Sequence, residues 1–185
     1  MNRILFANPK PADGKGVDRD DIQIQGIPSS PERTGVAFVT VTGDAPLREL
    51  ASHGEGSVGL LYCGGLLHRV SRDDAEALVA ASFRALRPLG TVRIATIDLD
   101  QIVHSYLFDW SDGHDAGVSR ARRLNAAFRQ PGLQFLYSEE ELTDVLARAG
   151  FADMRRFGVG ASSNPRFWNL EADRTQALIL EATKP

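Results

Sequence analysis

The 185-residue sequence predicts one α/β domain with a mostly parallel sheet, helices on both faces and a C-terminal antiparallel strand pair. Three observations predict this class. Short apolar runs bounded by Gly, Pro and Asn recur along the chain, and a capped amphipathic helix over 71–86 leads into a strand over 91–99, as in a parallel crossover. Two final strands, 154–159 and 176–182, are joined by too short a segment for a crossover helix, which indicates an antiparallel pair.

The first part of the chain is expected to form strands without a long helix. Residues 3–7 are an apolar run that ends at Asn8, typical of a buried strand entering a turn. Residues 35–42 are rich in β-branched and aromatic side chains and predict a strand, and 21–25 is a candidate for a shorter one. Pro, Gly, Asp and Ser are too frequent over 9–33 for a long helix.

The middle of the chain carries the most regular pattern. Residues 57–63 form an apolar run bounded by glycines, which predicts a central parallel strand. Ser71 stands three residues before Asp74 as a capping box, and apolar residues follow at helical spacing. Pro88 and Gly90 end this helix, so the next strand returns parallel to the first.

Residues 100–137 are irregular and are interpreted as an insertion or lid over the sheet. A short helix is expected over 102–107 and another over 116–128, with a polar loop between them. Four arginines are interpreted as a solvated helix face, or alternatively as an anchor for an anionic substrate: Arg120, Arg122, Arg123 and Arg129.

The C-terminal part is regular again. Ser138 and Glu141 form a second capping box, apolar residues follow along one helix face, and Gly150 stands where a left-handed cap belongs. The final strand pair follows, so the whole chain, 1–185, is interpreted as a single domain.

The composition is that of a globular protein, with 43% hydrophobic and 24% charged residues. The formal net charge is -3 and the basic residues form no stripe, which argues against nucleic acid as a partner. No apolar run is long enough for a bilayer span, and residues 1–10 lack the core of a signal peptide, so we expect a cytoplasmic protein without membrane contact. Cys63 is the only cysteine, which excludes an internal disulfide and indicates a small buried side chain.

Residues 56–99, GSVGLLYCGGLLHRVSRDDAEALVAASFRALRPLGTVRIATIDL, resemble the class I S-adenosylmethionine-dependent methyltransferases from their fourth strand to their fifth. Leu67 and His68 stand at the family's "eH", and residues 84–90, RALRPLG, stand at its "RvLkPGG". The resemblance continues through YSEEELTDVLARAGF and the final ALILEATKP, so it covers most of the chain. It implies a Rossmann-like fold and S-adenosylmethionine as cofactor.

In that family the carboxyl ends of the strands splay apart and leave a crevice for the nucleoside cofactor. Asp18 would accept the ribose hydroxyls, with Asp20 as the alternative residue for this role. The other interpretation of these aspartates is a solvated turn without a ligand. Asp44 would contact the adenine amine. The resemblance implies six cofactor-binding residues at the strand ends: Asn8, Gly14, Asp18, Asp44, Gly64 and Gly65.

The loop after the first strand departs from the family's pattern. In FANPKPADGKGVDRDD two prolines precede Gly14 and Gly16, where the family has G-x-G-x-G, and proline removes backbone donors and stiffens the loop. Gly59 and Leu89 replace a family aspartate and a family glycine. These departures motivate an alternative, a methyltransferase-like domain that has lost cofactor binding and acts as a partner or regulatory subunit.

His68 and Asp98 are the candidate catalytic residues. An imidazole ordinarily titrates near neutral pH and suits a general base toward a hydroxyl or amine, although His68 is alternatively a structural residue at a helix entry. Asp98 resembles the aspartate of the family's "PDl" and would orient a substrate. Tyr106 and Trp110 in the insertion are candidate substrate-binding residues. The His and Asp residues of the insertion match no established ligand spacing, so no metal is expected.

The sequence thus predicts an S-adenosylmethionine-dependent methyltransferase acting on a small molecule or a glycan precursor, because the insertion is short and nothing marks a macromolecular substrate. Positioning and desolvation supply much of the acceleration of methyl transfer, so a dedicated catalytic residue is optional. A homodimer or a protein partner is left open. The sequence has no P-loop, which argues against an ordinary nucleotide-binding protein.

Overall fold

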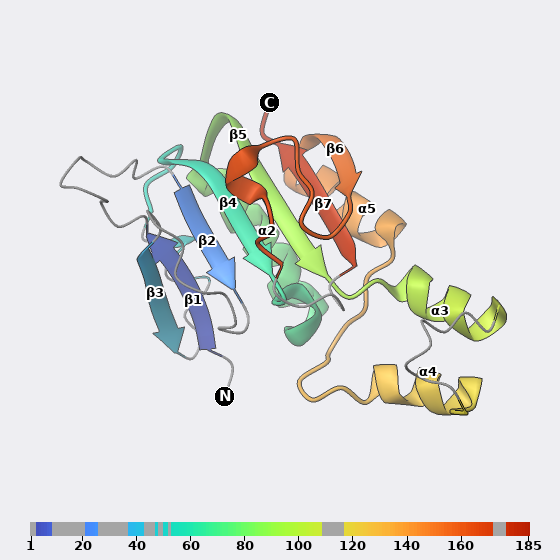
Figure 1. Cartoon of the computed structure of the whole chain (residues 1–185). Coiled ribbons are helices and arrows are strands. Elements are labelled where there is room, and N and C mark those ends of the chain that lie inside the picture. Colours follow the sequence, from blue (N-terminus) through green and yellow to red (C-terminus); the bar gives the residue numbers. More distant parts are fainter. Residues whose placement is uncertain are drawn as a thin grey trace.

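The computed structural model describes residues 3–8, 21–25, 37–42, 47, 50, 51, 53–108, 117–171 and 177–185, the first three ranges as backbone. Seven strands within these ranges form one sheet (Figure 1). The strands are β1 (Arg3–Asn8), β2 (Asp21–Gln25), β3 (Ala37–Thr42), β4 (Val58–Gly64), β5 (Leu86–Thr96), β6 (Ala152–Phe157) and β7 (Leu178–Thr183). The helical elements are η1 (Leu67–Arg69), α2 (Arg72–Ala85), α3 (Leu99–Phe108), α4 (Arg120–Phe128), α5 (Glu139–Ala149) and η2 (Pro165–Phe167).

The sheet is mixed. Its described strands stand in the order β3-β1-β2-β4-β5-β7-β6, and β4 at the centre is parallel to β2 and to β5. The other four neighbouring pairs among these strands are antiparallel. The prediction of a mostly parallel sheet is therefore wrong, whereas the predicted antiparallel pair of final strands is confirmed in β6 and β7.

The direction of β1 accounts for much of this difference. β1 runs against both of its neighbours, with Leu5 opposite Gln25 of β2 and Thr40 of β3. A parallel connection between adjacent strands normally uses a crossover helix, and the proline- and glycine-rich composition of residues 9–20 disfavours one. An antiparallel neighbour is the arrangement that such a connection permits.

The predicted central helix is confirmed as α2, and its cap is the predicted one. The Ser71 hydroxyl accepts a hydrogen bond from the Asp74 N–H at 3.1 Å, which satisfies a donor of the first turn. Ser138 caps α5 in the same way, and Gly150 ends that helix with a φ of 103°. A left-handed residue at this place favours glycine, as the sequence predicted.

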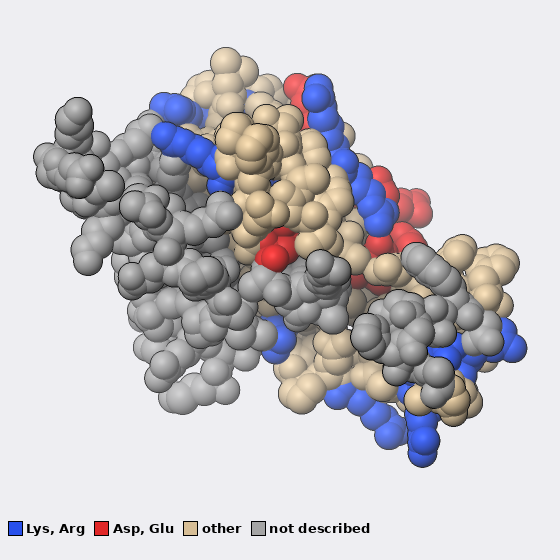
Figure 2. Space-filling model, in the orientation of Figure 1, with Lys and Arg blue, Asp and Glu red and all other residues tan. Residues whose placement is uncertain are grey.

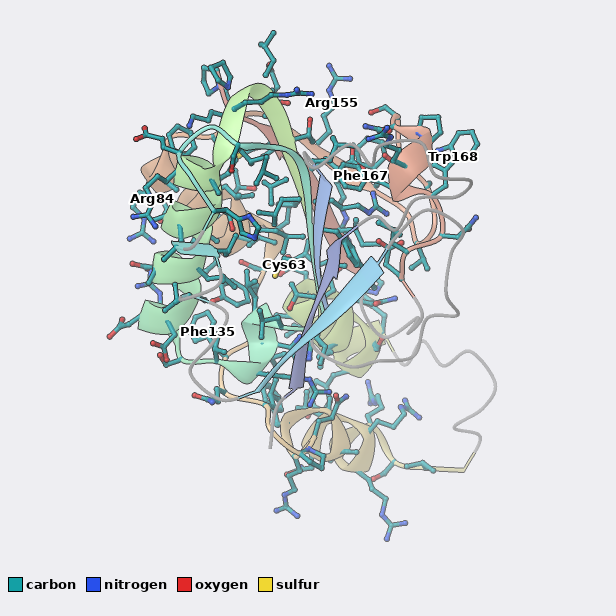
Figure 3. All side chains as sticks on the ribbon, turned by 90° about the vertical axis from the view of Figure 1, so that its left-hand side faces the viewer. Cys63, Arg84, Phe135, Arg155, Phe167 and Trp168 are labelled. Atoms are coloured by element: carbon teal, nitrogen blue, oxygen red, sulfur yellow. The ribbon has the colours of Figure 1, made fainter. Side chains whose placement is uncertain are left out.

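The two faces of the sheet are covered differently. α2 and α5 cover one face and form the main core with apolar side chains of β4, β5 and β7. The other face is covered by residues 158–171, which we call the strap; Figure 3 shows the strap residues Phe167 and Trp168 across the sheet from α2. The core beneath the strap contains no residue of the described α-helices, so the helices predicted for this face are not found within the described residues. Its buried members are Tyr62, Ala95, Phe167, Leu170 and Ile179.

α3 and α4 lie beyond the carboxyl end of β5 and pack against each other (Figure 1). Arg120 Nη1 donates hydrogen bonds to the carbonyls of Tyr106 and Leu107 at 3.3 and 3.2 Å, which satisfies acceptors at the end of α3. Figure 2 shows basic side chains around α4 on the surface, as expected for a solvated face, while the alternative of an anchor for an anionic substrate stays a prediction. None of the helices in the described ranges has the length and apolar character of a membrane span.

Leu89 has a left-handed backbone, with a φ of 63°, at the position where the resembling family has a glycine. Its side chain is 79% exposed and contributes little to packing. The leucine therefore strains the backbone without a compensating contact in the core.

Candidate functional site

The carboxyl ends of four strands lie at one edge of the sheet. Gln25, the last residue of β2, lies opposite Gly64, the last residue of β4, and Gly64 lies opposite Ala95 of β5. β3 ends at the same edge, because β2 and β3 both run against β1. Ligands of open α/β sheets bind outside the carboxyl ends, which makes this edge the candidate site.

The chain changes its direction of travel across the sheet between β2 and β4. After β2 it continues outward to β3, whereas after β4 it continues to β5 on the other side. At such a switch point the two following segments diverge and leave room for a ligand. The backbone after Gln25 and the turn at Gly64 and Gly65 are therefore the parts of the edge best suited to border one.

Asn8 does not share this edge. It ends β1 and lies opposite Ala37, the first residue of β3. Asp21, the first residue of β2, lies at that same opposite edge. The expectation that Asn8 and Gly64 line one crevice thus fails, because β1 runs in the opposite direction to β4.

Glycine is required at both positions of the β4 turn. Gly65 has a φ of 68°, and its N–H donates a hydrogen bond to the Ala95 carbonyl at 2.9 Å. A Cβ on Gly64 would collide with the phenol of Tyr62 on the same strand. Residues 64–68 are all buried, so this turn is enclosed by the protein.

His68 follows the turn in η1 and is only 4% exposed. Its Nδ1 is hydrogen-bonded to the Thr96 hydroxyl at 3.1 Å, and its carbonyl accepts the Gln134 N–H at 2.8 Å. The imidazole thus lies just past β4 and is hydrogen-bonded to the last residue of β5, in the interior of the protein and not at an open mouth. Thr96 was not predicted as a site residue, because its only signal in the sequence is its place at the end of a strand.

Asp98 is buried, and both of its carboxylate oxygens are engaged. Oδ1 accepts the Gln101 N–H at 3.1 Å and caps α3, while Oδ2 pairs with Arg156 Nη2 at 2.6 Å. Arg156 also pairs with Glu139 at 2.5 Å, so it joins β6 to the start of α5. Hydrogen bonding to Glu139, followed by the charge of Asp98, raises the pKa of Arg156. These contacts give Asp98 a structural role that the sequence did not reveal.

The remaining predicted site residues are not brought together with His68 in the described structure. Tyr106 lies in the last turn of α3, which extends away from the sheet, and is 41% exposed (Figure 1). Four predicted residues lie outside the described residues: Gly14, Asp18, Asp44 and Trp110.

The described residues give little evidence of a metal site or of a reactive thiol. No three His, Cys, Asp or Glu side chains are grouped there so as to hold a metal ion. Burial raises the pKa of the Cys63 thiol, which keeps it protonated and unreactive. The interpretation of Cys63 as a small buried side chain is confirmed.

No protein-family model matches the chain, and neither does any curated protein. Solved structures do match. A SAM-dependent methyltransferase from Archaeoglobus fulgidus is 10% identical over 78% of this chain and 66% of its own, with a TM-score of 0.51. A possible exported protein from Bordetella parapertussis is 19% identical over 74% of this chain and 42% of its own, with a TM-score of 0.47.

A third match is the 1,6-didemethyltoxoflavin-N1-methyltransferase of Burkholderia thailandensis, solved with 1,6-didemethyltoxoflavin and S-adenosylhomocysteine. It is 21% identical over 71% of this chain and 45% of its own, with a TM-score of 0.39. The chain thus spans 42% to 66% of the length of these three proteins. The likeness to the Archaeoglobus protein shows that the fold is that of the class I S-adenosylmethionine-dependent methyltransferases.

Proposed function

We propose that the chain binds S-adenosylmethionine at the carboxyl edge of β2 and β4 and transfers its methyl group to a small molecule or a glycan precursor. The observation that carries this proposal is the switch point between β2 and β4, which lies at the glycine turn of a methyltransferase fold. The shortness of the insertion that contains α3 and α4 supports a small acceptor.

The described residues at this edge fit the cofactor in part. Gly64 and Gly65 carry no Cβ, so their backbone can approach a ligand closely. The buried carboxylate of Asp98 is occupied by Arg156 and by the cap of α3, so it is not the ribose acceptor. That role is proposed for a residue outside the described ranges, with Asp18 and Asp44 as the candidates from the sequence; Asp44 follows β3, which ends at this edge.

When bound, S-adenosylmethionine would supply an electrophilic methyl group, and the protein's task would be to position the acceptor and exclude water. His68 is the proposed general base for a hydroxyl acceptor. Its hydrogen bond to Thr96 would fix the orientation of the ring, and its burial would keep bulk water away from the proton transfer.

A second candidate function is a methyltransferase-like domain that does not use the cofactor and acts through a protein partner. The specific observation in its favour is the enclosed turn: residues 64–68 are all buried, so a ligand would enter only if the surrounding structure opened. The position of Asn8 at the opposite edge also removes one predicted cofactor contact.

Calorimetric titration with S-adenosylhomocysteine separates the two functions. We expect the wild-type chain to bind, and Gly65→Ala to weaken binding about tenfold, because an alanine at a φ of 68° costs about 1–2 kcal/mol and distorts the turn.

Gly56→Ala is the matched control, since Gly56 has the same φ of 68° but precedes β4 at the other edge. It should cost similar stability and leave binding unchanged. No heat from the folded wild-type chain at millimolar ligand would refute the enzyme proposal and favour the second function.

A further inference from the structure

The short helix η1, which carries His68, has no side-chain cap at its start. It is a single turn, closed by the hydrogen bond from the Arg69 N–H to the Leu66 carbonyl at 2.8 Å, and the Leu66 side chain cannot cap it. The carbonyls at the end of such a turn have no partner within the helix and need one from elsewhere. The group that supplies this partner therefore decides how firmly the backbone of His68 is held.

Gln134 supplies a donor to two consecutive carbonyls of η1. Its N–H donates to the His68 carbonyl at 2.8 Å, and its side-chain Nε2 donates to the Arg69 carbonyl at 2.8 Å. Arg69 makes a bond in the other direction, because its Nη1 donates to the Pro131 carbonyl at 3.2 Å. These three bonds join η1 to residues 129–137, which we call the linker because they lead from the end of α4 towards α5.

The path of the linker is set on both sides of Gln134. Gly132, two residues earlier, has a left-handed φ of 80°, a backbone that favours glycine. The rings of Phe135 and Tyr137, which follow Gln134, pack edge to face with their centroids 4.8 Å apart, and Figure 3 shows Phe135 on the α2 side of the sheet. Gln134 is therefore presented to η1 by neighbours that hold the linker independently of its own side chain.

The backbone that Gln134 holds also determines where the imidazole of His68 lies. The ring is buried, and its Nδ1 is 3.1 Å from the hydroxyl of Thr96, which is itself 0% exposed. A buried hydrogen bond of this kind has no water to replace it, so a shift of the η1 backbone would weaken it directly. The side chain of Gln134 is exposed, so its replacement opens no cavity in the core.

We infer that Gln134 is a positioning residue for His68: its two hydrogen bonds hold the η1 backbone, and that backbone holds the imidazole against Thr96. The insertion of α3 and α4 is then joined to His68 through the linker, which continues directly from α4. The importance of this contact for methyl transfer rests on the proposed function, in which His68 is the general base. The effect of Gln134 on η1 and on the imidazole does not.

Gln134→Met tests the inference, because methionine has the same number of atoms along its chain and lacks the Nε2 donor. We expect the Arg69 amide, which closes η1, to exchange its hydrogen about two to ten times faster, the effect of one lost hydrogen bond. The second measurement is a long-range ¹H–¹⁵N NMR spectrum of the His68 ring. The wild type should show a single tautomer, and Gln134→Met should show nitrogen shifts moved towards the average of both tautomers.

Gln130→Met is the matched control. It makes the same change four residues earlier in the linker, at a side chain for which the described part of the chain records no hydrogen bond, so it should alter neither measurement. Thr96→Val separates the two steps of the inference. It removes the partner of the ring and should change the imidazole signals without faster exchange at Arg69.

The outcomes separate this inference from the proposed function. Faster Arg69 exchange together with altered imidazole signals, in Gln134→Met but not in Gln130→Met, supports the positioning role. It does so even if the wild-type chain binds no S-adenosylhomocysteine, in which case only the proposed function fails. Unchanged Arg69 exchange, unchanged imidazole signals, or equal changes in both variants overturns the positioning role, even if the wild-type chain binds the ligand tightly.

Discussion

Arg93 offers the sharpest test of what holds the strap side of the fold together. Arg93→Met keeps an unbranched apolar stem and removes the guanidinium from between Glu171 and Glu181. Because Arg93 is completely buried, two carboxylates are left without a counter-ion in the interior. Breaking a buried pair in this way costs about 3–5 kcal/mol.

Thermal unfolding followed by circular dichroism at pH 8 measures this loss. For a chain of this size about 1 kcal/mol lowers Tm by roughly 2–4 °C, so we expect a fall of about 6–20 °C. Arg155→Met is the control: Arg155 is an exposed residue of β6, and the change should stay within about 0.5 kcal/mol of wild type. An Arg93→Met protein as stable as Arg155→Met would refute the stabilising role of the ion pairs that Arg93 forms with Glu171 and Glu181.

The pH dependence of the same variant has a definite sign. Without Arg93, the folded state gains by protonating a buried carboxylate and binds more protons than the unfolded state, so stability falls as pH rises. Arg93→Met should therefore regain part of its loss between pH 8 and pH 5. In the wild type burial alone would lower the pKa of Arg93, but hydrogen bonds and charges of the two carboxylates raise it. The raised pKa of Arg93 puts its loss of stability above the ordinary range of arginine, far from this window. A loss that is constant between pH 8 and pH 5 would contradict the assignment.

Three further predictions concern single side chains. Leu89→Gly should be about 1 kcal/mol more stable than Leu89→Ala in urea unfolding, because both lose the exposed side chain and only glycine relieves the left-handed backbone; equal stabilities would exclude strain there. Tyr137→Phe should leave stability unchanged or raise it by up to about 2 kcal/mol, because it removes a buried hydroxyl without a partner; a lower Tm would reveal a missed hydrogen bond. Asp98→Asn should lower the free energy of unfolding by about 1–3 kcal/mol, because it weakens the contact with Arg156. It should leave the affinity for S-adenosylhomocysteine, measured by calorimetry, unchanged; a loss of affinity would indicate that Asp98 contacts the ligand.

The elements that could be predicted from the sequence are those with local causes. Ser71 and Ser138 predict where α2 and α5 begin, because a side-chain cap acts within one turn. Gly150 predicts where α5 ends, because a left-handed backbone favours glycine. The final antiparallel pair followed from the length and composition of a single connection. None of these inferences needed information from distant parts of the chain.

The direction of β1 could not be predicted in the same way. The apolar run over residues 3–7 indicates a strand but carries no sign of its direction or neighbours, and the assumption of a parallel strand misplaced Asn8. The composition of residues 9–20, which disfavours a crossover helix, was the available signal for a reversed neighbour.

The buried ion pairs of Arg93 with Glu171 and Glu181 could not be predicted for a related reason. Arg93 alternates with Val92 and Ile94, which is the pattern of a strand with one polar face, whereas the strap buries that face. The informative signal was a charge flanked by apolar residues in each of two neighbouring strands, Arg93 in β5 and Glu181 in β7. Such a pair is stable in the interior only when each charge has a partner.

Chemical-shift mapping of the isotope-labelled chain with S-adenosylhomocysteine tests the central claim most directly, since it reports where a ligand binds. Binding at the carboxyl edge should shift the amide signals of Gly64, Gly65 and His68 and leave that of Gly56, at the other end of β4, unchanged. Saturable shifts confined to the Gly56 end, or none at millimolar ligand, would contradict the assignment of this edge as the cofactor site.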